Sequence, residues 1–210
     1  MTGPDAAAEI IHIAEELRAI AANGLHYSDN HYDRDRYEQV RSLAARALAL
    51  ADTRGASEIE RRFRGDLGFA TPKASADAVI FDERDRLLLI QRNDGGEWCM
   101  PGGAADVGES PSQVAEREAR EETGLEVRAT GVLGVYDSRR LHGAEQPQTY
   151  NVAFACEVVG GELTTTNESL DFGWFTRADA AEVSLYRGHR VKVPQMFDIR
   201  AGIVAAPAFH

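Results

Sequence analysis

The first third of the chain carries apolar side chains at the three- and four-residue spacing of helices, without strand-like alternation. The two clearest runs are Ile10, Ile13, Ala14, Leu17 and Ala21, then Val40, Leu43, Ala44, Ala47 and Leu48. Gly24 can end the first helix, and Asp35 and Glu38 have capping-box spacing at the start of the second. Ser57 and Glu60 indicate a third, short helix.

From residue 74 the apolar residues gather in short β-rich runs separated by turn residues. The pattern predicts strands at residues 74–81, 87–91, 97–100, 127–136, 149–158 and 172–175. Residues 82–85 have the composition of a hairpin turn, and Gly160 and Gly161 predict another turn. Strands arranged around one central helix predict an α/β fold with a mixed sheet.

The C-terminal part of the chain is expected to be mostly helical. Residues 178–183 predict the start of a helix. Residues 187–200 are basic with interleaved apolar positions, which predicts a closing helix or a dimer arm that Pro194 interrupts.

The central helix places carboxylates where a packed helix usually places apolar side chains. At about 100° per residue, Glu118, Glu121 and Glu122 fall within roughly 80° of Val114. Three unpaired carboxylates on a half-buried stripe would repel one another and lose hydration, and a hard divalent cation removes both costs. The alternative is a solvated helix whose glutamates pair with arginines of the same helix.

Both ends of this helix carry clear signals. Ser110 is the expected N-cap and forms a capping box with Gln113, and Pro111 suits the first helical position. Gly124 suits a left-handed C-cap. A glycine-rich loop therefore leads into a helix that ends at a defined residue.

The segment from Gly103 to Leu125 resembles the Nudix box, which characterises a family of hydrolases. Its fixed positions are matched by Gly103, Glu109, Arg117, Glu118, Glu121, Glu122 and Gly124. Ala119 stands where a larger aliphatic residue is usual. The resemblance covers about residues 74–185. It implies the Nudix α/β/α sandwich with a mixed sheet, and metal-dependent cleavage of a nucleoside diphosphate linked to another moiety.

The resemblance also implies roles for the box residues. Glu118, Glu121 and Glu122 look like ligands of Mg²⁺ or Mn²⁺, and a carbonyl of Gly102 or Gly103 can complete the shell. Glu109 would assist through the metal shell or by pairing with Arg117, which is itself expected to orient the carboxylates. Glu121 and Arg117 are therefore expected to be catalytic.

A general base is also expected, because the attacking water must lose a proton. Glu168 is the candidate, since related pyrophosphatases use a glutamate from the loop before the strand at residues 172–175. A solvated loop glutamate is the alternative.

Substrate contacts are expected from a few basic and aromatic residues. Arg92 is placed to meet a phosphate, although a surface role is equally open. Aromatic candidates for stacking on a base, or alternatively for core packing, are Trp98, Tyr136 and Phe69. Arg139 and Arg140 can contact phosphate or simply be solvated.

The N-terminal helices resemble the extension that precedes the Nudix fold in some bacterial pyrophosphatases. The similar residues are Gly24, Leu25, His26, Tyr27, Tyr32, Asp33, Arg36, Tyr37 and Glu38. The expected organisation is a small all-helical domain at residues 1–70, followed by a Nudix hydrolase domain at residues 71–210. Helices of this size bury little area alone, so they are expected to pack on the second half or to form a homodimer.

Composition narrows the partners. The chain has 210 residues and 43% hydrophobic residues, which is enough for a packed core. No apolar run approaches the roughly 20 residues of a membrane span, and no signal peptide is evident. Cys99 and Cys156 do not form a secreted disulfide framework and are expected to be buried, so the expected location is the cytoplasm.

The formal net charge of −11 lies mostly after residue 72. An acidic surface makes nucleic acid an unlikely partner. It is compatible with an anionic substrate only if metals and a few arginines supply local positive charge.

The leading function is therefore a metal-dependent pyrophosphatase acting on a nucleoside diphosphate derivative, with ADP-ribose first and CDP-choline second. Sanitation of oxidised nucleoside triphosphates is a further possibility within the enzyme class. The alternatives of other classes are a non-catalytic Nudix-fold regulator that binds a nucleotide, and RNA processing by an exonuclease or decapping activity.

Overall fold

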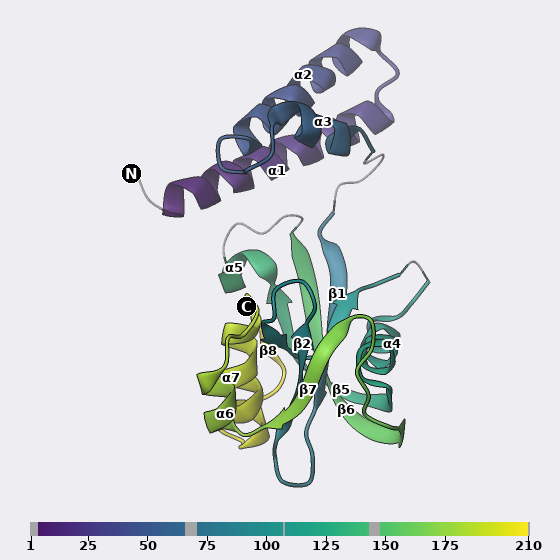
Figure 1. The fold of residues 1–210 in the computed structure, drawn as a ribbon. Helices are drawn as coiled ribbons and strands as arrows, with labels where there is room; N and C mark the ends of the chain where they lie inside the picture. The colour runs from purple at the N-terminus through teal and green to yellow at the C-terminus, as the bar shows by residue number, and fades with distance from the viewer. Residues whose placement is uncertain (1–3, 66–70, 107, 143–147, 210) are drawn as a thin grey trace. The chain divides into compact units, whose positions relative to one another are not determined.

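A computed structural model describes residues 4–65, 71–106, 108–142 and 148–209. The chain divides into two compact units, Met1–Pro72 and Lys73–His210, which are described separately (Figure 1). The expected stacking residue Phe69 lies outside the described residues.

The first unit contains three helices, α1 (Pro4–Tyr27), α2 (His31–Leu48) and α3 (Ala56–Gly65). They share a small core, made of Ala14, Ala44, Ala45, Leu48, Ile59 and Phe63. The helical character of this unit is as expected, and two of its predicted helix ends are wrong.

Gly24 lies inside α1 and does not end it. A Cβ built on Gly24 would come within 2.4 Å of the Tyr37 ring, so the glycine allows α1 and α2 to approach closely. α2 begins after Asn30, before the expected cap at Asp35, because the Asn30 side chain accepts a hydrogen bond from the Tyr32 N–H at 2.9 Å.

The second unit is built on two sheets. Its strands are β1 (Lys73–Ile80), β2 (Leu87–Arg92), β3 (Trp98–Cys99), β4 (Gly102–Ala104), β5 (Leu125–Asp137), β6 (Thr149–Gly161), β7 (Ser169–Phe175) and β8 (Ala208–Phe209). Within the described residues, one sheet has the order β4-β1-β6-β5-β8 and the other the order β3-β2-β7. The larger sheet is mixed, because β1 and β6 run parallel while β5 and β6 run antiparallel.

Helices cover both sides of these strands. The helices of the second unit are α4 (Pro111–Thr123), α5 (Ser138–His142), α6 (Arg177–Glu182) and α7 (His189–Arg200). Successive side chains of β2 alternate between two cores: Leu88 packs with α4, while Leu87 and Leu89 pack with α6 and α7. The resulting α/β/α arrangement confirms the expected fold (Figure 1).

Some local expectations for this unit are wrong. The sequence pattern did not predict β4, β8 or α5, whose segments are only two to five residues long. Gly160 and Gly161 end β6 and are not a free turn, since a Cβ on Gly161 would lie 2.3 Å from the Gly124 carbonyl oxygen. Pro194 lies within a continuous α7 and does not interrupt it.

Two remaining expectations concern the whole chain. Cys99 and Cys156 are free and buried, as expected. Among the described helices, none has the length and hydropathy needed to cross a bilayer.

Candidate active site

The capped helix α4 fixes the position of the site. Ser110 and Gln113 form the expected capping box, and Gly124 adopts the left-handed conformation with φ 75°. Val114, Ala115 and Ala119 bury the inner face of α4, which carries Glu118 and Glu122 toward the strands. Both glutamates are only 8% exposed.

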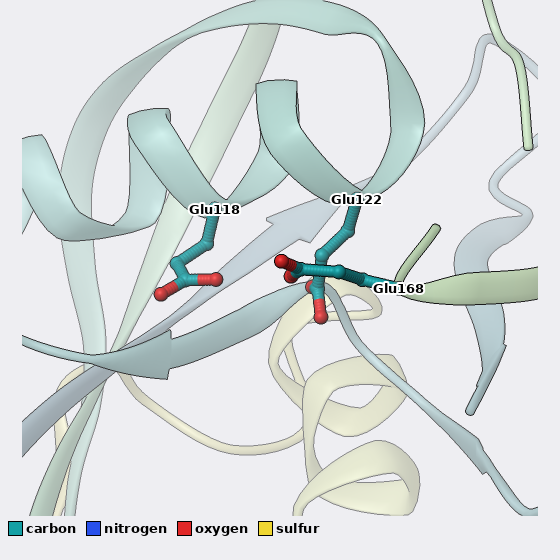
Figure 2. Close-up of side chains that lie close together, drawn as sticks. All are labelled: Glu118, Glu122 and Glu168. Carbon is teal, nitrogen blue, oxygen red and sulfur yellow. The ribbon is translucent and has the colours of Figure 1, made fainter. Parts of the chain in front are cut away.

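Three carboxylates meet next to this face. Glu118, Glu122 and Glu168 each offer one oxygen atom, and these atoms lie within 4.8 Å of one another. Figure 2 shows that Glu168 approaches the two helical glutamates from a different segment. The neighbouring Ser169 ties that segment to α4, because its Oγ donates a hydrogen bond of 2.7 Å to the Glu122 carbonyl oxygen.

The cluster is electrostatically unfavourable by itself. Burial raises the pKa of Glu122 to about 8, and the nearby charges of Glu118 and Glu168 act in the same direction. The N–H of Gly102 opposes this shift by donating a hydrogen bond of 2.8 Å to Glu122 Oε2. Burial also raises the pKa of Glu118.

This donor set fits a hard divalent cation. Carboxylate oxygens are the ligands that Mg²⁺ and Mn²⁺ prefer, and a cation would offset both the burial and the repulsion of these groups. β4 passes close to Glu118, since a Cβ on Gly103 would lie 2.3 Å from Glu118 Oε1. Glycine at this position therefore leaves the space that the carboxylate occupies.

Arg117 joins the remaining charged residues of the box. Its Nε donates a hydrogen bond of 2.7 Å to Glu109, and one terminal nitrogen donates to Glu118 at 2.9 Å and to Glu121 at 3.0 Å. Its other terminal nitrogen donates to the Ala104 carbonyl oxygen at 3.0 Å. This pairing lowers the pKa of Glu109 and raises the pKa of Arg117.

The carboxylate cluster therefore contains Glu168 in place of Glu121, which was expected there together with Glu118 and Glu122. Glu121 is exposed and faces Arg117, while Glu168 lies beside Glu118 and Glu122. Glu109 also faces Arg117. A role for Glu121 or Glu109 at the metal stays a prediction.

The expected substrate-binding residues separate into two groups. Arg92 lines a cavity of about 420 Å³ that also borders Gly102 and Gly103. Its guanidinium pairs with Asp94 at 2.6 Å and lies 4.2 Å from the centroid of the Tyr186 ring.

The other candidates do not line this cavity. Tyr136 is fully buried and donates a hydrogen bond of 2.8 Å to Gln195, so its placement agrees with core packing and not with base stacking. Trp98 packs against Phe175, with ring centroids 4.8 Å apart. Arg139 pairs with Asp137 at 3.0 Å. Arg140, also at α5, is exposed.

Five buried polar residues that the sequence did not single out line the cavity: Asp77, Ser138, Asn151, His189 and Lys192. For two of them, the sequence contains a recognisable sign of a buried polar position. Asp77 breaks an apolar run in β1, and Asn151 breaks another in β6. Because buried polar residues are hydrogen-bonded to partners, such breaks indicate a polar network inside the fold.

Two protein-family models match this chain. A family model described as the NUDIX domain matches residues 71–196, which is more than half of the chain. The chain belongs to the Nudix family. A second model, described as a UDP-X-like, N-terminal oligomerisation domain, matches residues 8–63.

One relative is similar over both units of the chain, and a second is similar over half of it. YjhB of Bacillus subtilis (strain 168), provisionally named an ADP-ribose pyrophosphatase, is 31% identical over 186 residues, covering 88% of this chain and 89% of YjhB. An ADP-ribose pyrophosphatase of Methanocaldococcus jannaschii is 31% identical over 109 residues. The matched region covers 50% of this chain and 62% of that protein. The chain is thus a Nudix hydrolase, with relatives named as pyrophosphatases.

Solved structures give the same fold. A crystal structure of a UDP-X diphosphatase matches with a TM-score of 0.61 and 23% identity, covering 97% of this chain and 99% of the other. A crystal structure of an ADP-ribose pyrophosphatase from Streptococcus suis 89-1591 matches with a TM-score of 0.56 and 32% identity, covering 67% of this chain and all of the other.

Proposed function

We propose that this Nudix hydrolase cleaves the diphosphate bond of a nucleoside diphosphate linked to a second moiety, in a reaction that depends on Mg²⁺ or Mn²⁺. ADP-ribose is the first candidate substrate and CDP-choline the second. The observation that carries the proposal is the convergence of the carboxylates of Glu118, Glu122 and Glu168. Gly102 and Gly103 lie next to these helical glutamates and also line the neighbouring cavity.

In this mechanism the protein supplies positioning and charge. Glu118 and Glu122 would hold the cation, with Glu121 added if its side chain turns from Arg117. When bound, the cation would neutralise charge at the phosphate oxygens and make a water more acidic. Glu168 is the base that accepts the proton of the attacking water.

Two arginines complete the arrangement. Arg117 orients Glu118 through its hydrogen bond, and its contact with Ala104 fixes α4 against β4. Arg92 is placed at the cavity wall, where a planar guanidinium can bind phosphate oxygens.

The choice of ADP-ribose rests on relatives. The names of YjhB and of the Streptococcus suis structure both refer to ADP-ribose. CDP-choline comes from the resemblance of the N-terminal helices to the extension of certain bacterial pyrophosphatases. Sequence similarity at this level supports the reaction type more strongly than the leaving group.

We also infer a homodimer formed through the N-terminal unit, because residues 8–63 match the model described as an oligomerisation domain. Two free, buried cysteines are consistent with the expected cytoplasmic location.

The test is a panel of ADP-ribose, CDP-choline, nucleotide sugars, dinucleotides, oxidised nucleoside triphosphates and a capped RNA, with products identified by mass spectrometry. We expect AMP from ADP-ribose with Mg²⁺ and no turnover in excess chelator. Glu122→Gln should lower kcat by about a thousandfold or more, because one cation ligand is lost. Glu157→Gln is the control, since Glu157 lies exposed on β6 and pairs with Arg128.

Three outcomes would contradict the proposal: full activity in chelator, wild-type turnover by Glu122→Gln, or hydrolysis of only the triphosphates or the capped RNA. Tight nucleotide binding without turnover of any compound would instead favour a regulatory Nudix protein.

A further inference from the structure

The cavity beside the carboxylate cluster is positively charged, although the chain as a whole is acidic. Its described lining carries four cationic side chains, from Lys73, Arg92, Arg187 and Lys192. Asp77 is the one carboxylate among the described lining residues. Against a formal net charge of −11, this cavity concentrates positive charge where a ligand can enter.

Lys192 occupies a fixed place in this cavity. It belongs to α7 and is 4% exposed, so its ammonium group is held inside the protein. It forms an ion pair with Asp77 and donates a hydrogen bond of 3.1 Å to Asn151 Oδ1. These contacts use two of the three protons of the ammonium group.

The partners of Lys192 are themselves fixed. Asn151 donates hydrogen bonds to Asp77 Oδ1 at 2.9 Å and to Ser75 Oγ at 3.0 Å. Asp77 therefore has both carboxylate oxygens occupied, one by Asn151 and one by Lys192. The ion pair neutralises Asp77 and Lys192 together, and these contacts leave one proton of the ammonium group for a ligand.

The aromatic surface of the cavity is also occupied by cations. The guanidinium carbon of Arg92 lies 4.2 Å from the centroid of the Tyr186 ring, and that of Arg187 lies 5.2 Å from it. Arg187 has a backbone φ of 31°, which residues other than glycine rarely adopt and which structures retain chiefly at functional sites. A quaternary ammonium group is bound by aromatic faces or by carboxylates. Here two guanidinium groups lie against the Tyr186 ring, and the Asp77 carboxylate is held by Asn151 and Lys192.

We propose that Lys192 is a specificity-determining residue that binds an anionic or hydroxyl-bearing group of the substrate, and that the cavity excludes a quaternary ammonium group. This inference rests on the proposed function and sharpens it: the moiety beyond the diphosphate is a sugar, a polyol or a phosphorylated group, and not choline. The binding of that moiety is measured separately from hydrolysis.

The first experiment compares ligands on the wild-type protein. Dissociation constants are measured by calorimetry in excess chelator for CDP-glycerol and CDP-choline. These compounds share the base and the diphosphate and differ in the charge and the hydroxyl groups of the second moiety. We expect CDP-glycerol to bind at least about tenfold more tightly, because cationic side chains outnumber carboxylates in the described lining of this cavity. Equal affinities, or tighter binding of CDP-choline, would overturn the proposal.

The second experiment removes the charge of Lys192. The double variant Asp77→Asn/Lys192→Met neutralises both members of the buried pair, so no unpaired charge is left inside the protein. The control, Asp85→Asn/Arg200→Met, removes another ion pair of α7. This pair connects α7 to the turn between β1 and β2 and lies outside the cavity. Circular dichroism verifies the folding of both variants.

We expect the dissociation constant for ADP-ribose to rise about tenfold or more in the Lys192 double variant and to change less than twofold in the control. An unchanged affinity in a folded Lys192 variant would refute this role. Binding that depends on Lys192 without hydrolysis of any compound in the substrate panel would contradict the proposed function alone. If the double variant does not fold, the comparison of CDP-glycerol with CDP-choline decides the question.

Discussion

Glu118 and Glu122 lie one turn apart on α4 with their carboxylates buried, and Glu168 reaches the same point from another segment. Taking carboxylates out of water and placing them side by side lowers the stability of the protein without its cation. Such costs are retained where function needs them. The cluster should therefore lower the stability of the cation-free protein and favour cation binding.

Glu122→Gln should stabilise the protein in chelator, and more so at pH 8 than at pH 5. Burial raises the pKa of Glu122 from 4.5 to about 8, so the folded protein resists losing this proton. The wild type then loses stability as the pH rises from about 5 to about 8, and the glutamine variant does not lose this contribution. The gap in unfolding free energy at pH 8 should be about 4 kcal/mol, at roughly 1.36 kcal/mol for each unit by which the pKa is raised.

Urea unfolding in chelator at both pH values measures this gap. Saturating Mg²⁺ should reverse its sign, because only the wild type keeps all its ligands. A gap that is the same at pH 5 and pH 8 would show that burial of Glu122 does not control the stability of the cluster.

Glu168→Gln should lower kcat by about a hundredfold or more and change KM little, because a general base acts in the chemical step. Glu168 is exposed, so the unfolding temperature should stay close to that of the wild type. Glu162→Gln, another exposed glutamate before β7, is the matched control. Wild-type kcat in Glu168→Gln would exclude this residue as the base.

β4 and α4 depend on each other, although Gly102 and Glu122 lie 20 positions apart in the sequence. β4 pairs with β1, which brings Gly102 within hydrogen-bonding distance of Glu122 and Gly103 against Glu118. Arg117 adds a second connection through the Ala104 carbonyl. The short strand therefore acts as the wall that sets the positions of the helical carboxylates.

Gly103→Ala should weaken cation binding about tenfold or more with little loss of fold. The new Cβ would lie 2.3 Å from Glu118 Oε1, so the side chain must move away from its position, and metal sites tolerate little displacement. Gly95→Ala is the control, because no atom lies within 4 Å of the position of its Cβ. Titration with Mn²⁺, followed by its paramagnetic resonance signal, gives the affinities. Equal affinities in both variants would show that β4 does not position Glu118.

The two units of the molecule carry different features: one holds the candidate active site, and the other has an exposed apolar surface. The Lys73–His210 unit holds the carboxylate cluster and the cationic cavity. The Met1–Pro72 unit presents an apolar stripe on α1, where Ile13, Ile20 and Tyr27 are exposed at seven-residue spacing. Residues seven apart lie on one side of a helix, so the stripe suits contact with a second copy of this unit.

Ile13→Glu/Ile20→Glu should convert the proposed dimer to a monomer, because charges on the stripe oppose its burial. Leu50→Glu is the control, since Leu50 is 79% exposed, follows α2 and is not part of the α1 stripe. Light scattering coupled to gel filtration reports the mass. A dimeric double variant would show that the stripe is not the contact surface.

The sequence by itself determined the features that depend on neighbouring residues. Helical spacing and caps gave α4 between Ser110 and Gly124, and the box gave the family that the comparisons confirm. Short apolar, β-rich runs predicted the longer strands and the mixed α/β fold.

Only the tertiary structure decided which distant residues meet. It placed Glu168 beside Glu118 and Glu122, left Glu121 facing Arg117, and formed the pair of Asp77 and Lys192 across 115 positions. It also formed β4, which is a strand only because β1 pairs with it. The reason is physical: periodicity and capping record contacts within a few residues, whereas the burial and charge of a site come from segments that the chain brings together only when it folds.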